Sequence, residues 1–418
     1  MIKMVFMHQL QYYAERIPWN GFKPYGKYKE LQGNSVLLGL KGRKTRKGFR
    51  YNYNKPVYLD FGIDSNNPLN LLIMGRKGAG KTTISASIGF QLWKYFQCNL
   101  FIIDPQANIP AFKYPQTNPT FLHYLEEAGV KSEPMPLHVL TPKFFRGSPK
   151  FKNTDTYYSV SMDDIISIDE FSFKRQLLAS LLGVEDQEPS MRKLDEVMAT
   201  DPQSFERFKK ELENLNKSNK FFDRIKVLDN NFKRRLSEGV ISDYDKVDIV
   251  KILNNQPVGL QCSLSTEDKI NMTYIAFALY SIKAGMEAGK IEGKTVFVTD
   301  EADILAPSGN KNPPSKIPLE HMSTKWRKDG AIPINLVQDP ARLSTTILQQ
   351  VDAVLTPAIG YNTSEENFIR SKFPNVSTME LMQLHYGKSS NYPKEWALIT
   401  SQGIETFYPL PNPFLMTL

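Results

Sequence analysis

The chain has 418 residues, a formal net charge of +8 and 41% hydrophobic residues, which suits a globular protein with one large domain and an accessory region. No stretch approaches the ~18 consecutive apolar residues of a transmembrane helix, and the amino terminus lacks the apolar core of a secretory signal. The two cysteines, Cys98 and Cys262, lie far apart in the sequence, so we expect no disulfide framework or zinc site and a reducing, cytoplasmic location.

Basic charge is concentrated near the amino terminus. Residues 1–60 contain 12 Lys and Arg against three acidic residues, whereas the other 358 residues carry 40 basic and 41 acidic groups. We interpret residues 1–60 as a basic arm or small subdomain, in which predicted strands at 35–40 and 54–60 form a hairpin. The cations expected near its tip are Lys41, Arg43, Lys44, Arg46, Lys47 and Arg50. Contact with a nucleic-acid backbone is one interpretation, and a solvated turn or contact with acidic lipid are the others.

A phosphate-binding loop follows the first buried strand, at 71–74. The sequence matches G-x-x-x-x-G-K-[ST] in full and leads into a helical pattern. Glycines let backbone N–H groups converge on an anion, Lys81 adds positive charge, and the Thr82 hydroxyl can bind Mg²⁺. The alternative is a glycine-rich turn that matches the pattern by chance. The buried strand before it and the helical pattern after it argue against that alternative. The predicted cofactors are ATP and Mg²⁺, and the predicted nucleotide-binding residues are Gly75, Arg76, Lys77, Gly78, Ala79, Gly80, Lys81, Thr82 and Thr83.

Further strands and helices alternate along the chain. The predicted core strands after the loop are 99–104, 137–140, 258–264, 295–298, 334–337, 351–356 and 396–400. This alternation predicts an α/β fold with a mainly parallel, twisted sheet flanked by helices. The core is expected in two halves, 61–144 and 256–418, separated by a helical insertion at 145–255 that serves as a lid or subunit contact.

Acidic residues follow one of these strands. Asp300 and Glu301 come directly after the strand region 295–299, where an ATPase needs one acid to hold Mg²⁺ and a second to polarise the attacking water. Gln338 ends the next strand and would lie beside the γ-phosphate, where it could orient water. The alternatives are an acidic helix cap and a surface glutamine.

Taken together, four segments resemble the FtsK–HerA superfamily of DNA-pumping ATPases: GRKGAGKTT, FIIDPQ, TVFVTDEAD and WRKDGAIPINLVQDPARL. The lead-in, LLGLKG and PVYLD before NLLIMG, resembles the conjugative ATPases of type IV secretion. The resemblance covers roughly residues 35–140 and 258–410. It implies a P-loop NTPase with a RecA-like core of the ASCE type, working as a hexameric ring around DNA.

The resemblance also implies an arginine that reaches the ATP of the neighbouring subunit. Arg327 is the first candidate and Arg342 the second. Two departures stand out. Asn108 lies near the place where HerA-type proteins often have a glutamate, and only about 60 residues precede the core, too few for the β-barrel of HerA itself.

The leading hypothesis is an ATP-driven DNA translocase, in conjugation-like transfer or in DNA import or export. A loop at 307–318 would line the pore and contact DNA through Lys311 and Lys316. The alternatives are a secretion ATPase that energises a membrane apparatus without touching DNA, and a HerA-like translocase in DNA end processing. A nucleotide-dependent scaffold is disfavoured by Glu301. We expect a cytoplasmic protein, free or peripheral at the cytoplasmic face of the membrane, with a channel or transfer-apparatus partner.

Overall fold

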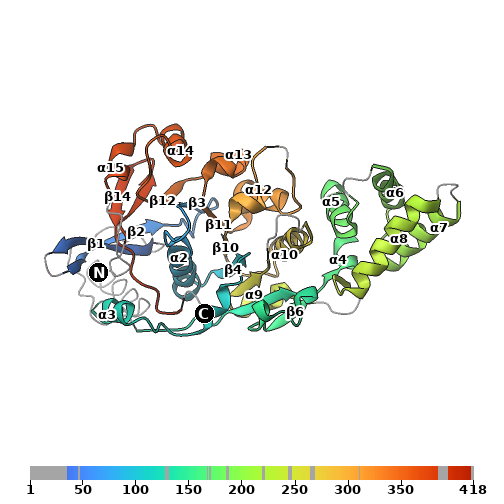
Figure 1. The fold of residues 1–418 in the computed structure, drawn as a ribbon, viewed down its shortest axis with the longest axis horizontal. Helices are drawn as coiled ribbons and strands as arrows, with labels where there is room; N and C mark the ends of the chain where they lie inside the picture. Colours follow the sequence, from blue (N-terminus) through green and yellow to red (C-terminus); the bar gives the residue numbers. More distant parts are fainter. Residues whose placement is uncertain are drawn as a thin grey trace, which may run out of the picture.

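The structure of the chain is a computed structural model (Figure 1). It describes residues 35–45, 48–127, 131–166, 168, 171–184, 188–218, 222–242, 247–263, 269–309, 311–384 and 394–415. Most of the predicted basic arm, residues 1–34, lies outside the described residues.

The core is a ten-stranded sheet with the order β14-β13-β12-β3-β11-β10-β4-β9-β5-β6. Neighbouring strands from β12 to β6 run parallel, and β13 and β14 are antiparallel to their neighbours. The strands are β3 (Leu71–Met74), β4 (Asn99–Asp104), β5 (His138–Pro142), β6 (Thr156–Tyr158), β9 (Val258–Gln261), β10 (Thr295–Thr299), β11 (Ala331–Val337), β12 (Ala353–Pro357), β13 (Trp396–Thr400) and β14 (Gly403–Phe407). The predicted α/β fold with a mainly parallel sheet is confirmed, and every predicted core strand is present. The half-exposed strands β6 and β14 have no counterpart among the predicted strands.

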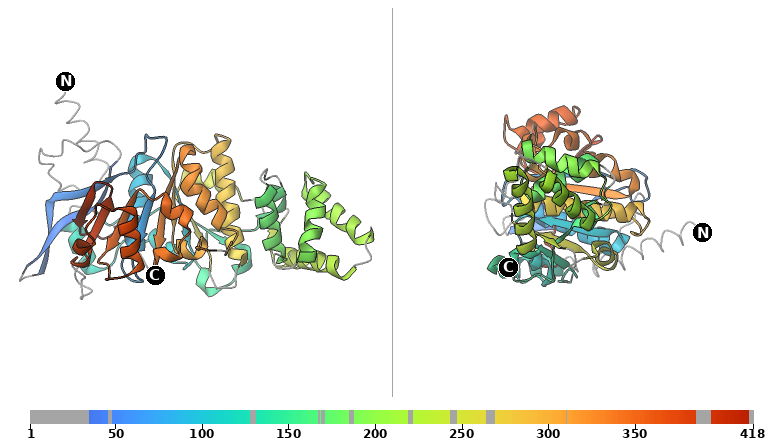
Figure 2. Two further views of the ribbon diagram at one scale, coloured as in Figure 1. Left: turned by 90° about the horizontal axis from the view of Figure 1, so that it is seen from above. Right: turned by 90° about the vertical axis from the view of Figure 1, so that its right-hand side faces the viewer.

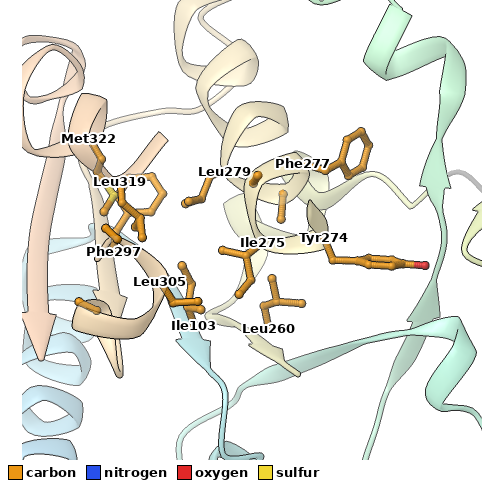
Figure 3. Close-up of a cluster of buried hydrophobic side chains, with 14 of the residues drawn as sticks. Ile103, Leu260, Tyr274, Ile275, Phe277, Leu279, Phe297, Leu305, Leu319 and Met322 are labelled. Carbon is orange, nitrogen blue, oxygen red and sulfur yellow. The ribbon is translucent and has the colours of Figure 1, made fainter. Parts of the chain in front are cut away.

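Helices cover both faces of this sheet, which is why the central strands are apolar on both sides. Leu71 and Ile73 of β3 belong to one hydrophobic cluster with the helix that follows the phosphate loop. Leu72 and Met74 belong to a second cluster on the opposite face. Figure 3 shows part of the second cluster, including Ile103, Leu279, Phe297, Leu319 and Met322.

The helices of the core lie between and after these strands. The α-helices are α2 (Lys81–Phe96), α3 (Pro119–Glu127), α9 (Ile249–Asn255), α10 (Lys269–Glu287), α11 (Ala302–Leu305), α12 (Lys316–Thr324), α13 (Thr345–Gln349), α14 (Ser364–Lys372) and α15 (Thr378–Met382). Short 3-10 helices are η1 (Ile109–Lys113), η2 (Lys143–Phe145), η3 (Pro149–Phe151), η4 (Trp326–Asp329) and η5 (Pro340–Arg342). Within the described ranges, none of the helices combines the length and apolar character that crossing a bilayer requires.

The predicted hairpin at the start of the described chain is present. β1 (Ser35–Thr45) and β2 (Gly48–Asp60) pair antiparallel and dock on the end of the large sheet. Leu40 and Tyr408 exchange two backbone hydrogen bonds of 3.0 and 2.8 Å there. A Cβ on Gly39 would stand 2.3 Å from the carbonyl oxygen of Tyr408, so only glycine allows this close approach.

The helical insertion projects from the opposite end of the molecule, as two views agree (Figures 1 and 2). Its elements are β7 (Val160–Ser161), α4 (Met162–Ile166), α5 (Phe171–Leu182), α6 (Glu188–Ala199), α7 (Phe205–Ser218), α8 (Phe222–Ser237) and β8 (Ile241–Ser242). The predicted bounds, 145–255, are therefore too wide. β6 extends the main sheet and α9 packs on α10, so both belong to the core. α5 also packs on α10, where the hydroxyls of Thr273 and Ser180 lie 2.8 Å apart.

Candidate active site

The phosphate loop joins β3 to α2 in the conformation that its glycines permit. Gly78 and Gly80 have φ values of 75° and 105°, in the region that residues with a Cβ rarely adopt. The Lys81 ammonium donates a 2.7 Å hydrogen bond to the Gly75 carbonyl and so spans the loop. Burial lowers the pKa of Lys81, while Asp300, Glu301 and Asp303 act in the opposite direction. The amino end of α2 opens onto the loop, an arrangement suited to phosphate binding.

Residues far along the chain support the loop from outside. Lys394 donates a 2.6 Å hydrogen bond from its ammonium to the Gly78 carbonyl. The Asn412 side-chain amide donates to the Thr83 carbonyl at 2.6 Å. The sequence carries no signal for either contact, because each joins positions more than 300 residues apart.

Asp300 reaches the loop because β10, β11 and β3 are neighbouring parallel strands that end at the same edge of the sheet. The Thr82 hydroxyl and a carboxylate oxygen of Asp300 lie 3.4 Å apart. Two oxygens bound side by side to one Mg²⁺ ion at ~2.1 Å each are separated by about 3 Å. The two groups are therefore placed to hold one Mg²⁺ ion, directly or through water.

The electrostatics of Asp300 also fit a cation. Burial raises the pKa of Asp300 from an ordinary 3.8 to about 7, and the neighbouring carboxylates of Asp104 and Glu301 add to the rise. In the part of the chain that the structure describes, no cluster of three or more His, Cys, Asp or Glu side chains could hold a metal without other ligands. Mg²⁺ usually shares its ligands between one or two protein groups and phosphate oxygens, so this small ligand set suits a metal–nucleotide complex.

Glu301 is buried and lies beside Asp300 with a left-handed backbone, at φ 52°. The Gln338 side-chain amide donates to both of its carboxylate oxygens, at 2.8 and 2.9 Å. The Gln106 amide donates to one of the same oxygens at 2.7 Å. The structure thus brings the predicted Glu301 and Gln338 together and adds Gln106. The only signal for Gln106 in the sequence is its place just after the apolar strand β4.

Asp104 organises the turn that presents Gln106. Its buried carboxylate accepts backbone hydrogen bonds from Gln106 and Ile109, both 2.8 Å, and from Asn108. Burial raises the pKa of this carboxyl group, and the three backbone donors oppose the rise. Asn108 contributes its backbone N–H here, near the place where HerA-type proteins often have a glutamate.

Asp303 is a further buried acid, on α11, two residues after Glu301. It is 1% exposed, and neither carboxylate oxygen has a hydrogen-bond partner among the described residues. Burial and the charge of Glu301 raise the pKa of Asp303, while Arg342 opposes the rise.

The prediction that Arg327 reaches a neighbouring subunit needs correction. Arg327 is 5% exposed, and its guanidinium donates to the Pro68 carbonyl at 2.8 and 2.5 Å and to the Asp352 carboxylate at 2.6 Å. Because its guanidinium N–H groups are bonded within the fold, Arg327 is not available to reach the ATP of a neighbouring subunit. Arg342, the second candidate, is exposed on η5, four residues after Gln338.

Two of the lysines predicted to contact DNA bind partners within the chain instead. Lys316 is buried at the start of α12, and its ammonium donates to the carbonyls of Gly309 and Lys311 at 3.0 and 3.2 Å. Lys41 donates to the Thr406 carbonyl and lies 3.6 Å from the Glu405 carboxylate. Lys311, the other lysine of the predicted pore loop, is exposed. The remaining hairpin cations, whose side chains lie outside the described residues, are Arg43, Lys44, Arg46, Lys47 and Arg50.

Comparison with known proteins rests on structure alone, because the sequence matches no family model and no curated protein. VirB4 of Thermoanaerobacter pseudethanolicus superposes over 91% of this chain and 97% of its own, with a TM-score of 0.53 and 15% identity. The chain has the fold of VirB4. The bacterial conjugative coupling protein TrwB is similar over 87% of this chain and 88% of its own, with a TM-score of 0.51 and 11% identity. The VirB4-like fold agrees with the P-loop NTPase fold that the sequence resemblance implies.

Proposed function

We propose that this chain is an ATPase of the FtsK–HerA type that hydrolyses ATP in the presence of Mg²⁺ and uses the energy to move DNA in conjugation-like transfer or in DNA import or export. The observation that carries the proposal is the meeting of the phosphate loop, Asp300 and the Glu301–Gln338 pair at one edge of the sheet. The fold shared with TrwB, a conjugative coupling protein, supports the assignment to DNA transfer.

Each residue of the site has a distinct role in this proposal. The loop N–H groups and Lys81 bind the phosphates, and Thr82 and Asp300 hold the Mg²⁺ ion, which neutralises phosphate charge. Glu301 accepts the proton of the attacking water, and Gln338 keeps the Glu301 carboxylate in position.

The site is linked to the proposed pore loop through backbone contacts. The N–H of Ser308 donates to the Arg342 carbonyl at 2.7 Å, and the N–H of Ser344 donates to the Ala306 carbonyl at 2.8 Å. These bonds join the segment that follows Gln338 to the loop that carries Lys311. A change in the Glu301–Gln338 contact would therefore be transmitted to Lys311 and to DNA beside it.

The assembly proposed for this activity is a hexameric ring in which Arg342 approaches the ATP of the neighbouring subunit. The ring would work in the cytoplasm, at the cytoplasmic face of the membrane where it meets a transfer apparatus. A secretion ATPase that does not touch DNA is the alternative, and it differs in what the basic hairpin binds.

Steady-state ATPase assays with no DNA, single-stranded DNA and double-stranded DNA test the proposal. We expect stimulation by at least one DNA form, and loss of activity in Lys81→Ala and Glu301→Gln. Lys290→Ala, an exposed lysine after α10, is the matched control and should behave like the wild type. A rate that is indifferent to both DNA forms, with no DNA retention at low salt, would contradict DNA translocation. Negative-stain images of the same samples show whether the chain assembles into the proposed hexameric ring.

A further inference from the structure

Tyr361 is an aromatic side chain exposed beside the phosphate loop. It is 74% exposed, in the loop that follows β12. β12 lies next to β3 and parallel to it, with Leu355 opposite Ile73. The carboxyl end of β12 therefore opens at the same edge of the sheet as the phosphate loop.

The loop after β12 adjoins the phosphate loop directly. A Cβ on Gly75 would lie 3.1 Å from the Pro357 ring, so the start of the phosphate loop and the end of β12 lie close together. A Cβ on Gly360 would lie 4.0 Å from the Arg76 guanidinium. Tyr361 is the next residue.

This loop is held in one conformation by a buried acid. The Glu366 carboxylate, on α14, accepts hydrogen bonds from the Asn362 backbone at 2.7 Å and from the Thr378 hydroxyl at 3.2 Å. Thr363 caps the helix by accepting a 3.3 Å bond from the Glu366 N–H. Asn362 adopts a left-handed φ of 52°. The Thr363 hydroxyl also donates to the Gly360 carbonyl at 3.1 Å, so the backbone is held on both sides of Tyr361 while its ring is left in solvent.

The order of the strands indicates on which side of the phosphate loop the base of a bound nucleotide would lie. Glu301 and Gln338 follow β10 and β11, on one side of β3, so the terminal phosphate faces that side. The base must leave the phosphate loop away from these residues, and β12 is the neighbour of β3 on the other side. We infer that Tyr361 stacks on the nucleobase and so completes the nucleotide site. This inference rests on the proposed function, because it takes a nucleoside triphosphate as the ligand.

Binding of MgATP and of magnesium tripolyphosphate, which has no base, tests the inference by calorimetry. Base–aromatic stacking predicts that Tyr361→Ala weakens ATP binding by about 5- to 150-fold. The same variant should bind tripolyphosphate like the wild type, and Tyr361→Phe should keep the ATP affinity. Met379→Ala, which removes another exposed apolar side chain, on α15, is the control and should change neither affinity.

The outcomes separate this inference from the proposed function. Wild-type ATP affinity in Tyr361→Ala, or equal weakening of both ligands, would overturn stacking. If Tyr361→Ala binds both ligands like the wild type but forms a smaller oligomer, Tyr361 is a subunit contact and the stacking inference is wrong. Lys81→Ala should weaken both ligands. If it weakens neither, the proposed nucleotide site itself is wrong, whatever Tyr361 does.

Discussion

The side-chain amide of Gln338 donates to both carboxylate oxygens of Glu301, at 2.8 and 2.9 Å. The two residues end neighbouring parallel strands, so the contact depends on the register of β10 with β11. Because it fixes the carboxylate that we assign as the general base, the contact couples hydrolysis to the position of β11.

Removing this amide should slow hydrolysis without weakening nucleotide binding. We expect Gln338→Ala to lower kcat by about 10- to 100-fold, less than the roughly 100- to 10,000-fold that a positioned general base itself contributes, because Glu301 is still present. The ATP affinity should stay within about twofold of the wild type, because Gln338 does not contact the phosphate loop in this account. Steady-state kinetics and nucleotide titration measure the two quantities.

Gln106 provides the matched comparison, since it donates to the same carboxylate from the turn that follows β4. Gln106 donates to one oxygen of Glu301 whereas Gln338 donates to both, so Gln106→Ala should slow hydrolysis less than Gln338→Ala does. A drop as large as that of Gln338→Ala would show that both amides act only by fixing Glu301.

The buried Asp300 should make the nucleotide-free protein less stable as pH rises. Its pKa is raised from 3.8 to about 7, so between these values the folded chain keeps a proton that the unfolded chain has lost. Stability therefore falls as pH rises from about 4 to about 7. At pH 8, Asp300→Asn should be more stable than the wild type by about 2–4 kcal/mol in chemical denaturation.

The difference should shrink toward pH 4, where both proteins carry a neutral group at this position. MgATP should stabilise the wild type more than Asp300→Asn, because the variant lacks the metal-binding charge. An Asp300→Asn protein that is less stable at pH 8 without nucleotide would contradict the assigned electrostatics.

Replacing Arg327 should lower the stability of the chain, whereas replacing Arg342 should lower its activity. Arg327→Ala removes the hydrogen bonds to the Pro68 carbonyl and the ion pair with Asp352. We expect a loss of about 1–3 kcal/mol, limited because Asp352 is partly exposed and keeps its bond from the Asn70 N–H. Arg342→Ala should unfold like the wild type but hydrolyse ATP more slowly once assembled. Thermal unfolding and ATPase rates across protein concentration distinguish the two. Normal hydrolysis by assembled Arg342→Ala would exclude Arg342 as the residue that acts between subunits.

The basic hairpin should account for much of the salt dependence of DNA binding. In the test variant, Lys41 is kept because it is paired with β14, and the residues replaced by glutamine are Arg43, Lys44, Arg46, Lys47 and Arg50. For duplex DNA, each lost phosphate contact should reduce the slope of log affinity against log salt by about 0.9. The control replaces five exposed lysines of the core: Lys131, Lys251, Lys290, Lys325 and Lys328.

Vesicle flotation with anionic lipid separates the two candidate roles of the hairpin. If the variant keeps DNA binding and loses only vesicle binding, the hairpin contacts membrane and the secretion ATPase is favoured. If DNA binding is lost, the translocase is favoured.

The sequence predicted those features whose chemistry lies in consecutive residues. The phosphate loop, the strand before Asp300 and the strand before Gln338 each combine an apolar run with the polar residues that follow it, so both the fold and the main acids could be predicted. Strand ends in a parallel sheet meet at one edge, which is why the sequence predicts Gln338 beside the γ-phosphate; its contact with Glu301 comes from the structure.

The features that the sequence did not predict depend on contacts between distant segments. Arg327 has the sequence context of a free cation, but Pro68 lies 259 positions earlier and fills its donors. Lys316 belongs to the loop that the sequence predicts to line the pore, whereas the structure buries it at the start of α12 and bonds it to the loop backbone. No local pattern distinguishes an arginine or lysine that will be buried from one that stays exposed.

Coupled movement is the central claim, and displacement of a third strand from duplex DNA measures it most directly. The assay follows ATP-dependent release of a labelled triplex-forming strand by the wild type and by Glu301→Gln, with partly single-stranded substrates in parallel. The account predicts release by the wild type that requires hydrolysis, and none by Glu301→Gln although it binds ATP. Rapid ATP hydrolysis by the wild type with no displacement on any substrate would contradict it.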